Sequence, residues 1–134
     1  NIGIIINRKG EKIMVNYQQL PIYRDVYVLL TEIYQDTDKF PRSCKYTLGQ
    51  DMKRDALNLF RYISVANISV ERRGEALSQF LEAFELLKIE IRLCVDLNIM
   101  SIKKLAQLSL LTDGIAKQAS AWRRGTRKKM TASL

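Results

Sequence analysis

Histidine is absent from the 134-residue sequence, and its absence removes several classes of active site. A serine or cysteine nucleophile has no imidazole base to activate it, and a zinc site has no histidine ligand. The Glu-x-x-His motif of di-iron helical bundles cannot be built either. No nucleophile or acid–base constellation can be assembled from the other residues, so we predict a protein that is not an enzyme and that uses no cofactor or metal.

Cysteine is scarce and long apolar runs are lacking. Cys44 and Cys94 are too few for a disulfide framework, so we expect two reduced thiols in a cytoplasmic protein. No apolar run approaches the roughly 18 residues that span a bilayer. The length is sufficient for the core of one domain without disulfides or metals.

Acidic residues are nearly absent from the last quarter of the chain. Residues 101–134 carry eight Lys or Arg against Asp113 alone, whereas residues 1–100 are almost neutral. The net charge of +8 is therefore concentrated at the C-terminal end. This asymmetry predicts a polyanionic partner, nucleic acid before a membrane surface.

Apolar residues recur at helical spacing in four segments separated by short turns, which predicts an all-α fold. The expected helices run from about Pro21 to Lys39, from Thr47 to about Ala66, from Ser69 to the turn at Asn98, and from Ser101 to about Arg124. The expected core stripes are Ile22, Val26, Leu29, Leu30 and Ile33; Leu48, Met52, Ala56, Leu59, Phe60 and Ile63; Leu77, Phe80, Leu81, Phe84, Leu87, Ile91, Cys94 and Val95; and Leu105, Leu108, Thr112, Ile115, Ala119 and Trp122.

The third helix has a second apolar stripe on a different face, formed by Leu86, Ile89, Leu93 and Leu97. A surface helix of a bundle needs only one apolar stripe, and a helix that is apolar on several sides is buried on several sides. We therefore interpret the second stripe as an interface between subunits.

The two ends of the chain fit none of these helices. Residues 1–19 form an N-terminal extension in which Met14 could be the natural start, and apolar, β-branched residues 2–6 would be extended if ordered. We assign residues 20–125 to the helical domain, with Gly125 as the residue that ends the last helix. Residues 126–134 would then be a polar, basic tail with no core to join.

The corner between the first two helices reads FPRSCKYTLGQ from Phe40 to Gln50. Pro41 ends the preceding helix, because its ring disfavours the α conformation of Phe40. Thr47 and Gln50 have the T-x-x-Q spacing of a capping box. In this motif the Thr47 hydroxyl accepts a hydrogen bond from the Gln50 backbone N–H, and the Gln50 side chain accepts one from the Thr47 backbone N–H. The corner also carries Arg42 and Lys45.

Basic residues of the last helix form the candidate nucleic-acid site. Cations near a helix C-terminus are favourable with the helix dipole, and a basic surface also improves solubility. That explanation fits Arg123 and Arg124 but not Lys103 and Lys104, which lie where the dipole opposes them. A phosphate-binding face explains the cations at both ends of this helix. The absence of any base-reading motif predicts binding without sequence preference. The candidates are Lys103, Lys104, Lys117, Arg123, Arg124, Arg127, Lys128 and Lys129, with Arg42 and Lys45 at the corner as a second position.

Four features together resemble one protein family: the opening Leu20-Pro21-Ile22-Tyr23, the FPRSCKYTLGQ corner, the apolar third helix and the terminal Trp122. The resemblance covers about Leu20 to Arg124. It is to the four-helix-bundle family that includes the accessory variability determinant (Avd) of diversity-generating retroelements. Proteins encoded in intervening sequences of large-subunit ribosomal RNA genes are relatives that share the corner motif.

The resemblance implies an antiparallel up-down four-helix bundle that assembles as a ring-shaped homopentamer. It also implies a non-catalytic accessory role, binding the retroelement reverse transcriptase and its template RNA or cDNA. The ending Trp122-Arg123-Arg124 favours Avd over the intervening-sequence type, whose role is RNA binding or unknown. A module that binds anionic lipid ranks lower, because Gly114 and Ala121 stand in the basic stripe where large apolar residues would be needed.

Overall fold

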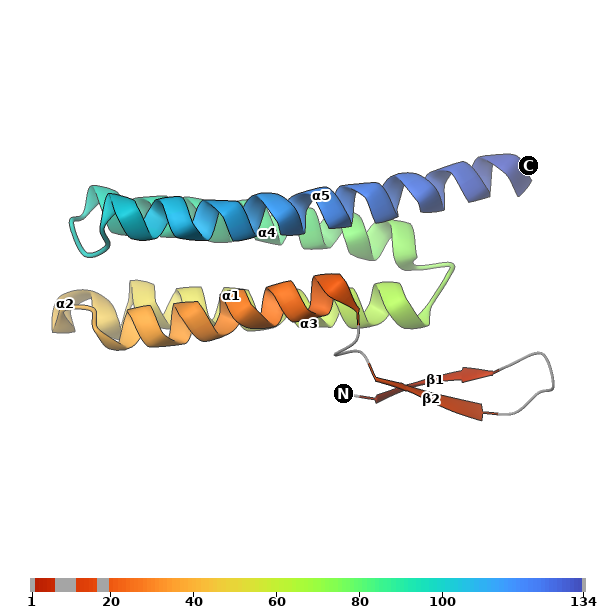
Figure 1. Cartoon of the computed structure of the whole chain (residues 1–134), viewed down its shortest axis with the longest axis horizontal. Coiled ribbons are helices and arrows are strands. Elements are labelled where there is room, and N and C mark those ends of the chain that lie inside the picture. Colours follow the sequence, from red (N-terminus) through yellow and green to blue (C-terminus); the bar gives the residue numbers. More distant parts are fainter. Residues whose placement is uncertain (1, 7–11, 17–19, 134) are drawn as a thin grey trace.

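The computed structural model describes residues 2–6, 12–16 and 20–133, with side chains from 20 to 128 (Figure 1). A β-hairpin precedes a bundle of four long helices, and one short helix lies in the first corner. The elements are β1 (Ile2–Ile6), β2 (Lys12–Asn16), α1 (Pro21–Asp38), α2 (Arg42–Lys45), α3 (Leu48–Ile68), α4 (Arg73–Asp96) and α5 (Ile102–Ser133).

The long helices alternate in direction along the bundle, as Figure 1 shows. α1 packs against α3 and α5, and α4 packs against α3 and α5. The α1–α5 pair therefore forms one face of the bundle and the α3–α4 pair forms the opposite face. The expected helical bundle with up-down connections is confirmed for residues 20–133. Within the described residues, no helix is both long and apolar enough to cross a membrane.

The core lies where the periodicity places it. The predicted positions are buried at the centre of each stripe, and positions at the stripe edges, including Leu30, Phe60 and Trp122, are partly buried. Deep packing of Leu29, Leu59, Phe80 and Ile115, none of them measurably exposed, ties the four helices together. The main buried cluster consists of Ile22, Val26, Leu29, Ile33, Phe40, Met52, Ala56, Leu59, Ile63, Phe80, Phe84, Leu87, Ile91, Cys94, Leu108, Ile115 and Ala119. Ala66, Ala76 and Leu77 form a second buried cluster.

The connection from α4 to α5 has a regular helix-ending geometry. Asn98 takes a left-handed backbone conformation with φ of 60°. The Ile99 N–H donates to the Cys94 carbonyl at 2.9 Å, and the Asn98 N–H donates to the Val95 carbonyl at 3.0 Å, which is a Schellman motif. The Lys104 N–H then donates to Ser101 Oγ at 3.0 Å, confirming Ser101 as the N-cap of α5.

The start of α4 differs slightly from the prediction. Ser69 Oγ accepts from the Arg72 N–H at 3.2 Å, as a cap would. However, this bond closes a turn, and the helix begins only at Arg73. The Arg73 guanidinium donates to the Ala66 carbonyl at 2.6 Å and so satisfies an acceptor at the end of α3. The side chains of Ser69 and Arg73 therefore both stabilise the α3–α4 turn.

The prediction of a capping box at the corner is wrong. Thr47 precedes α3, but its side chain makes no cap hydrogen bond. The Thr47 hydroxyl donates backwards instead, to the carbonyls of Ser43 at 3.2 Å and Cys44 at 3.4 Å. The reason is the unforeseen helix α2, whose last carbonyls lack intrahelical donors and lie within reach of Thr47.

Replacing Thr47 by alanine is expected to lower the free energy of unfolding by about 0.5 kcal/mol, since one exposed hydroxyl contact is lost. Replacing Gln50 by alanine should leave stability unchanged, because Gln50 has no reciprocal bond to lose. Thermal unfolding of both variants checks this. Equal destabilisation by the two substitutions would instead indicate that Thr47 and Gln50 form a capping box.

The predicted end of the last helix at Gly125 is also wrong. α5 continues through the expected tail to Ser133. Thr126 is buried, and its hydroxyl donates to the Trp122 carbonyl at 3.1 Å. The Thr126 methyl carbon lies 4.0 Å from where a Cβ of Gly74 would stand, so the extra turn packs on the start of α4. A glycine inside a helix costs only about 1 kcal/mol, and tertiary packing of this kind offsets it.

The N-terminal hairpin adds two strands to the expected all-helical architecture. The extended conformation expected for residues 2–6 is confirmed: they form β1, which pairs antiparallel with β2. The register places Ile4 opposite Met14 and Ile5 opposite Ile13.

Candidate nucleic-acid interface

α5 presents a row of cations to solvent along the side opposite its core seam. Lys103, Lys117 and Arg124 are exposed, and they share heptad spacing with Leu110, which is 80% exposed. At a rise of about 1.5 Å per residue, the interval from Lys103 to Arg124 spans roughly 30 Å. We call these three residues, together with Lys128, the basic row.

The helical extension beyond Gly125 carries the charge further along the same helix. Lys128 lies one turn after Arg124 and is exposed, and Arg127 is exposed beside it. Lys129 belongs to α5, but its side chain lies outside the described residues. Because α5 continues past Gly125, Arg127 and Lys128 lie on the same helix as Lys117 and Arg124 rather than on a loose tail.

Lys104 is turned away from the basic row toward α1. Its ammonium forms an ion pair and hydrogen bond with Glu32 and lies 3.5 Å from Asp36 Oδ2. The hydrogen bond to Glu32 raises the pKa of Lys104, with the neighbouring carboxylates adding to this effect. Lys104 therefore links α1 to α5, and the structure does not bring it to the predicted site.

Arg123 is likewise directed toward a neighbouring helix, in this case α4. Its Nη1 donates to Ser78 Oγ at 3.4 Å, and its Nε is buried without a hydrogen-bond partner among the described residues. Trp122 beside it packs under the Arg73 guanidinium, 5.5 Å from the ring centroid. Arg123 thus belongs to the packing of α5 on α4 rather than to the basic row.

Arg42 and Lys45 lie in α2, at the end of the bundle where α5 begins (Figure 1). Arg42 is exposed. The Lys45 ammonium is 3.4 Å from Asp38 Oδ1 and 5.9 Å from the Tyr46 ring centroid. The structure therefore places these two cations near the Lys103 end of the bundle, remote from Arg124 and Lys128.

An acidic cluster between α3 and α4 escaped the sequence analysis. Glu90 is only 9% exposed, and burial, reinforced by a hydrogen bond and the charge of Asp55 and by the charge of Asp51, raises the pKa of Glu90 from 4.5 to about 8. Arg54 lies 3.3 Å from Asp51 and 3.6 Å from Asp55, which opposes this shift. Arg54 thus forms salt bridges on α3 beside Glu90, whose burial was not predicted. Its helical spacing from Leu87 and Cys94 is the signal that could have placed it beside the core.

The second apolar stripe of α4 is exposed in the single chain. Leu86, Ile89, Leu93 and Leu97 are 51%, 63%, 41% and 48% exposed. Glu90 lies next to the stripe, one turn after Leu86 and nearly one turn before Leu93. Soluble proteins seldom leave a contiguous apolar patch of this kind uncovered.

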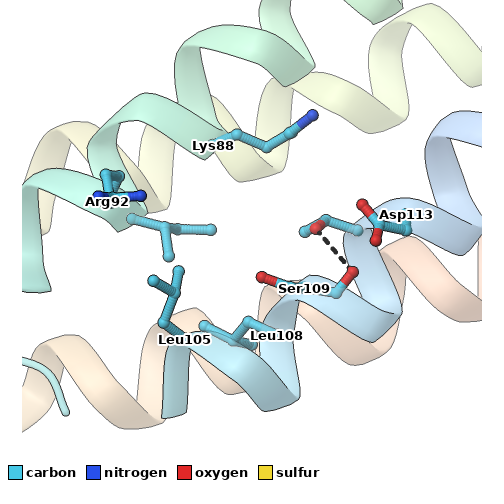
Figure 2. A pocket seen from close by; sticks show the side chains of 8 residues that line it. Lys88, Arg92, Leu105, Leu108, Ser109 and Asp113 are labelled. Carbon is cyan, nitrogen blue, oxygen red and sulfur yellow. Dashed lines mark hydrogen bonds between the residues drawn. The ribbon is translucent and has the colours of Figure 1, made fainter. Parts of the chain in front are cut away.

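A shallow cavity of about 190 Å³ lies between α4 and α5 (Figure 2). Lys88 and Arg92 line it from α4, opposite Ser109 and Asp113 of α5. It is smaller than the roughly 300 Å³ at which small-molecule sites begin. In the part of the chain with described side chains, no group of three acidic or cysteine residues could hold a metal ion.

Comparison with known families places these observations in context. A family model described as bAvd-like matches residues 14–126, which include all of α1 to α4 and most of α5. Residues 1–13 lie outside the match. A comparison with curated proteins found none that matches the chain.

Proposed function

Since the chain belongs to the bAvd-like family, we propose that it is a non-catalytic, nucleic-acid-binding accessory protein of a diversity-generating retroelement. In this role it binds the retroelement reverse transcriptase and the template RNA or its cDNA, and it supports mutagenic cDNA synthesis. The observation that carries the proposal is the basic row of α5: cations at heptad spacing on the solvent side of a helix whose opposite side is core.

The row suits a phosphate backbone better than a set of bases. Its members lie along one helix, with successive axial separations of roughly 21, 10 and 6 Å, so one side of a nucleic acid strand or duplex meets several of them in sequence. Ala106, Gly114 and Ala121 lie between the cations and let a backbone approach closely. Lysine and arginine contacts to phosphate carry no sequence information, so binding should be general and strongly dependent on salt.

The exposed stripe of α4 is the proposed contact between subunits of a ring-shaped homopentamer. Covering Leu86, Ile89, Leu93 and Leu97 removes an apolar patch from water, which favours association. A ring also repeats the basic row, so a long RNA reaches several rows at once and gains avidity. Light scattering is expected to give five times the 15.5 kDa mass of one chain. A monomer at micromolar concentration would contradict the ring.

The function is tested by offering the purified protein three polyanions at one ionic strength: the template RNA, duplex DNA and vesicles of anionic lipid. Binding to both nucleic acids, with little flotation on vesicles, supports the proposal. Binding to vesicles alone would refute it and would identify the basic row as a membrane surface.

A further inference from the structure

Two tyrosines of α1 are exposed on the side of that helix that packs against α3 (Figure 1). Tyr27 is 52% exposed and Tyr34 is 45% exposed. Tyr27 contacts the ring of Phe60 of α3, and Tyr34 contacts the ammonium of Lys53 of α3. Their heptad spacing separates the two tyrosines by about 10 Å along α1. Tyr23, one turn before Tyr27, is only 6% exposed, so packing uses Tyr23 fully and leaves the other two rings partly open to solvent.

Two aromatic neighbours hold the ring of Tyr27 in place. It stacks on Tyr23, with 6.5 Å between the ring centroids and 14° between the ring planes. It also makes an edge contact with Phe60, whose ring centroid is 6.4 Å away. An open hollow of about 470 Å³ lies beside it, and the described lining residues are Tyr23, Arg24, Tyr27 and Val28. Because the ring is fixed before a ligand arrives, a flat ligand can stack on it at little cost in conformational entropy.

Each exposed ring has a cation beside it. Arg24 is exposed and lines the hollow next to Tyr27. The Lys53 ammonium lies 5.4 Å from the centroid of the Tyr34 ring. We call Tyr27, Tyr34, Arg24 and Lys53 the aromatic face. Aromatic rings interleaved with cations are typical of surfaces that bind single-stranded nucleic acid.

Three carboxylates of α1 are directed toward α5, away from the aromatic face. Gln118 Nε2 of α5 donates to Asp25 Oδ2 at 2.6 Å. Lys104 of α5 forms ion pairs with Glu32 and Asp36. These carboxylates therefore do not offset the charge of the cations on the α3 side of α1.

The remaining carboxylates of α1 and α3 are also engaged elsewhere. Asp55 of α3 shares a hydrogen bond with Glu90 of α4, and the charge of Asp51 acts on the same carboxyl group. Asp38, at the end of α1, lies 3.4 Å from the Lys45 ammonium. The aromatic face is thus left with a net positive charge, which suits a phosphate-bearing ligand.

We propose that the aromatic face binds unpaired bases of single-stranded nucleic acid, with one base stacked on Tyr27 and another on Tyr34, while Arg24 and Lys53 contact the adjoining phosphates. The inference rests on the nucleic-acid binding proposed above and adds a surface that distinguishes a single strand from a duplex. A base inside a duplex is stacked on both sides, so only an unpaired base presents its face to a tyrosine ring.

The aromatic face and the basic row lie on different helices and recognise different chemistry. The basic row of α5 meets phosphates, which single strands and duplexes both carry. The aromatic face of α1 and α3 meets the flat surfaces of bases, which every base has, so it adds affinity without a sequence preference. Binding through this face also favours the open form of an RNA over its folded form, because only the open form supplies unpaired bases.

Comparing two strands of equal length tests this on the wild-type chain. One is an oligouridylate, and the other is an abasic strand with the same phosphates and no bases. Stacking contributes about tenfold in affinity for each base, so the chain should prefer the oligouridylate on the order of a hundredfold. Because this comparison needs no variant, it decides the inference by itself: a wild type that binds both strands equally overturns it.

Two double variants locate the preference. Tyr27→Leu with Tyr34→Leu removes both rings and keeps apolar side chains, so this variant should bind the two strands equally. Tyr27→Phe with Tyr34→Phe keeps the rings and should retain the wild-type preference. Affinity for the abasic strand, and its dependence on salt, should be the same in all three proteins because the phosphate contacts remain. Helicity and mass by light scattering should also be unchanged.

The outcomes separate this inference from the proposed function. A leucine variant that still prefers the oligouridylate overturns the inference, because the bases are then held elsewhere. A leucine variant that loses the wild-type assembly also overturns it and identifies the aromatic face as a contact between subunits. In both cases binding to the abasic strand and to duplex RNA leaves the proposed function standing. A wild-type chain that binds no nucleic acid at all refutes the proposed function itself.

Discussion

Reversing three charges of the basic row, with Lys117→Glu, Arg124→Glu and Lys128→Glu, is expected to lower RNA affinity on the order of a hundredfold at about 0.1 M salt. The affinity comes from phosphate neutralisation, with about 0.7 to 0.9 counterions released per contact. In the proposed ring every subunit loses the same contacts, which enlarges the expected effect. All three side chains are exposed, so helicity and assembly should not change.

The matched control reverses three exposed cations elsewhere, Lys39, Arg61 and Arg72. Both triple variants lower the net charge from +8 to +2 at neutral pH, so they differ only in where the charge is lost. Affinity measured against salt concentration should have a shallower slope for the basic-row variant than for the control. Equal slopes would mean that the phosphates are held elsewhere, with Arg42 and Lys45 in α2 as the next candidates.

Replacing Glu90 by glutamine is expected to remove a loss of stability that the wild-type protein shows as the pH rises. The pKa of Glu90 is about 8 in the folded chain, against an ordinary value of 4.5. Between these values the folded state holds a proton that the unfolded state has released. Stability therefore falls with rising pH across this window, by about 1.4 kcal/mol per pH unit while that difference is complete.

Glutamine keeps the shape of Glu90 and can donate to Asp55 without any proton to lose. The variant should match the wild type near pH 4.5 and exceed it by a few kcal/mol at pH 8. Chemical denaturation at pH 5, 6, 7 and 8 measures this. Glu82→Gln on the same helix is the control, because that side chain is exposed and its neutralisation should not alter the pH profile. Parallel profiles for wild type and Glu90→Gln would show that Glu90 is ionised in the folded protein.

Periodicity predicted the bundle because burial is a collective property of many residues. The stripe through Leu108, Ile115 and Ala119 has the same period as the helix that carries it, and every member reports the same face. A single misjudged residue does not change the result. The exposed stripe of α4 was found in the same way, from its period rather than from any one leucine.

Helix ends and single polar side chains were less predictable, because each depends on one local competition. Thr47 had a suitable spacing from Gln50, but the carbonyls at the end of α2 compete for its hydroxyl. Gly125 had the chemistry of a helix end, but the contact of Thr126 with α4 continues the helix. In both cases the deciding partner is a segment whose position the sequence pattern does not specify.

The candidate site illustrates the same limit. Lys103 and Lys104 are adjacent in sequence, yet one is exposed and the other is paired with Glu32 and Asp36 across the α1–α5 seam. Arg123 and Arg124 differ in the same way, because Arg123 donates to a side chain of α4 whereas Arg124 is exposed to solvent. A charge count locates a basic helix, whereas its neighbours determine which of its cations are available to a ligand.

We propose that this chain is an accessory protein required by a reverse transcriptase. The most direct measurement is cDNA synthesis in a reconstituted reaction containing the retroelement reverse transcriptase, its template RNA and the chain at a fixed ionic strength. We predict that the chain binds the enzyme and the RNA in one complex, that cDNA accumulates only when it is present, and that the basic-row variant supports much less synthesis than its charge-matched control. Equal cDNA yield with and without the chain, and no complex with the enzyme, would contradict the proposed function.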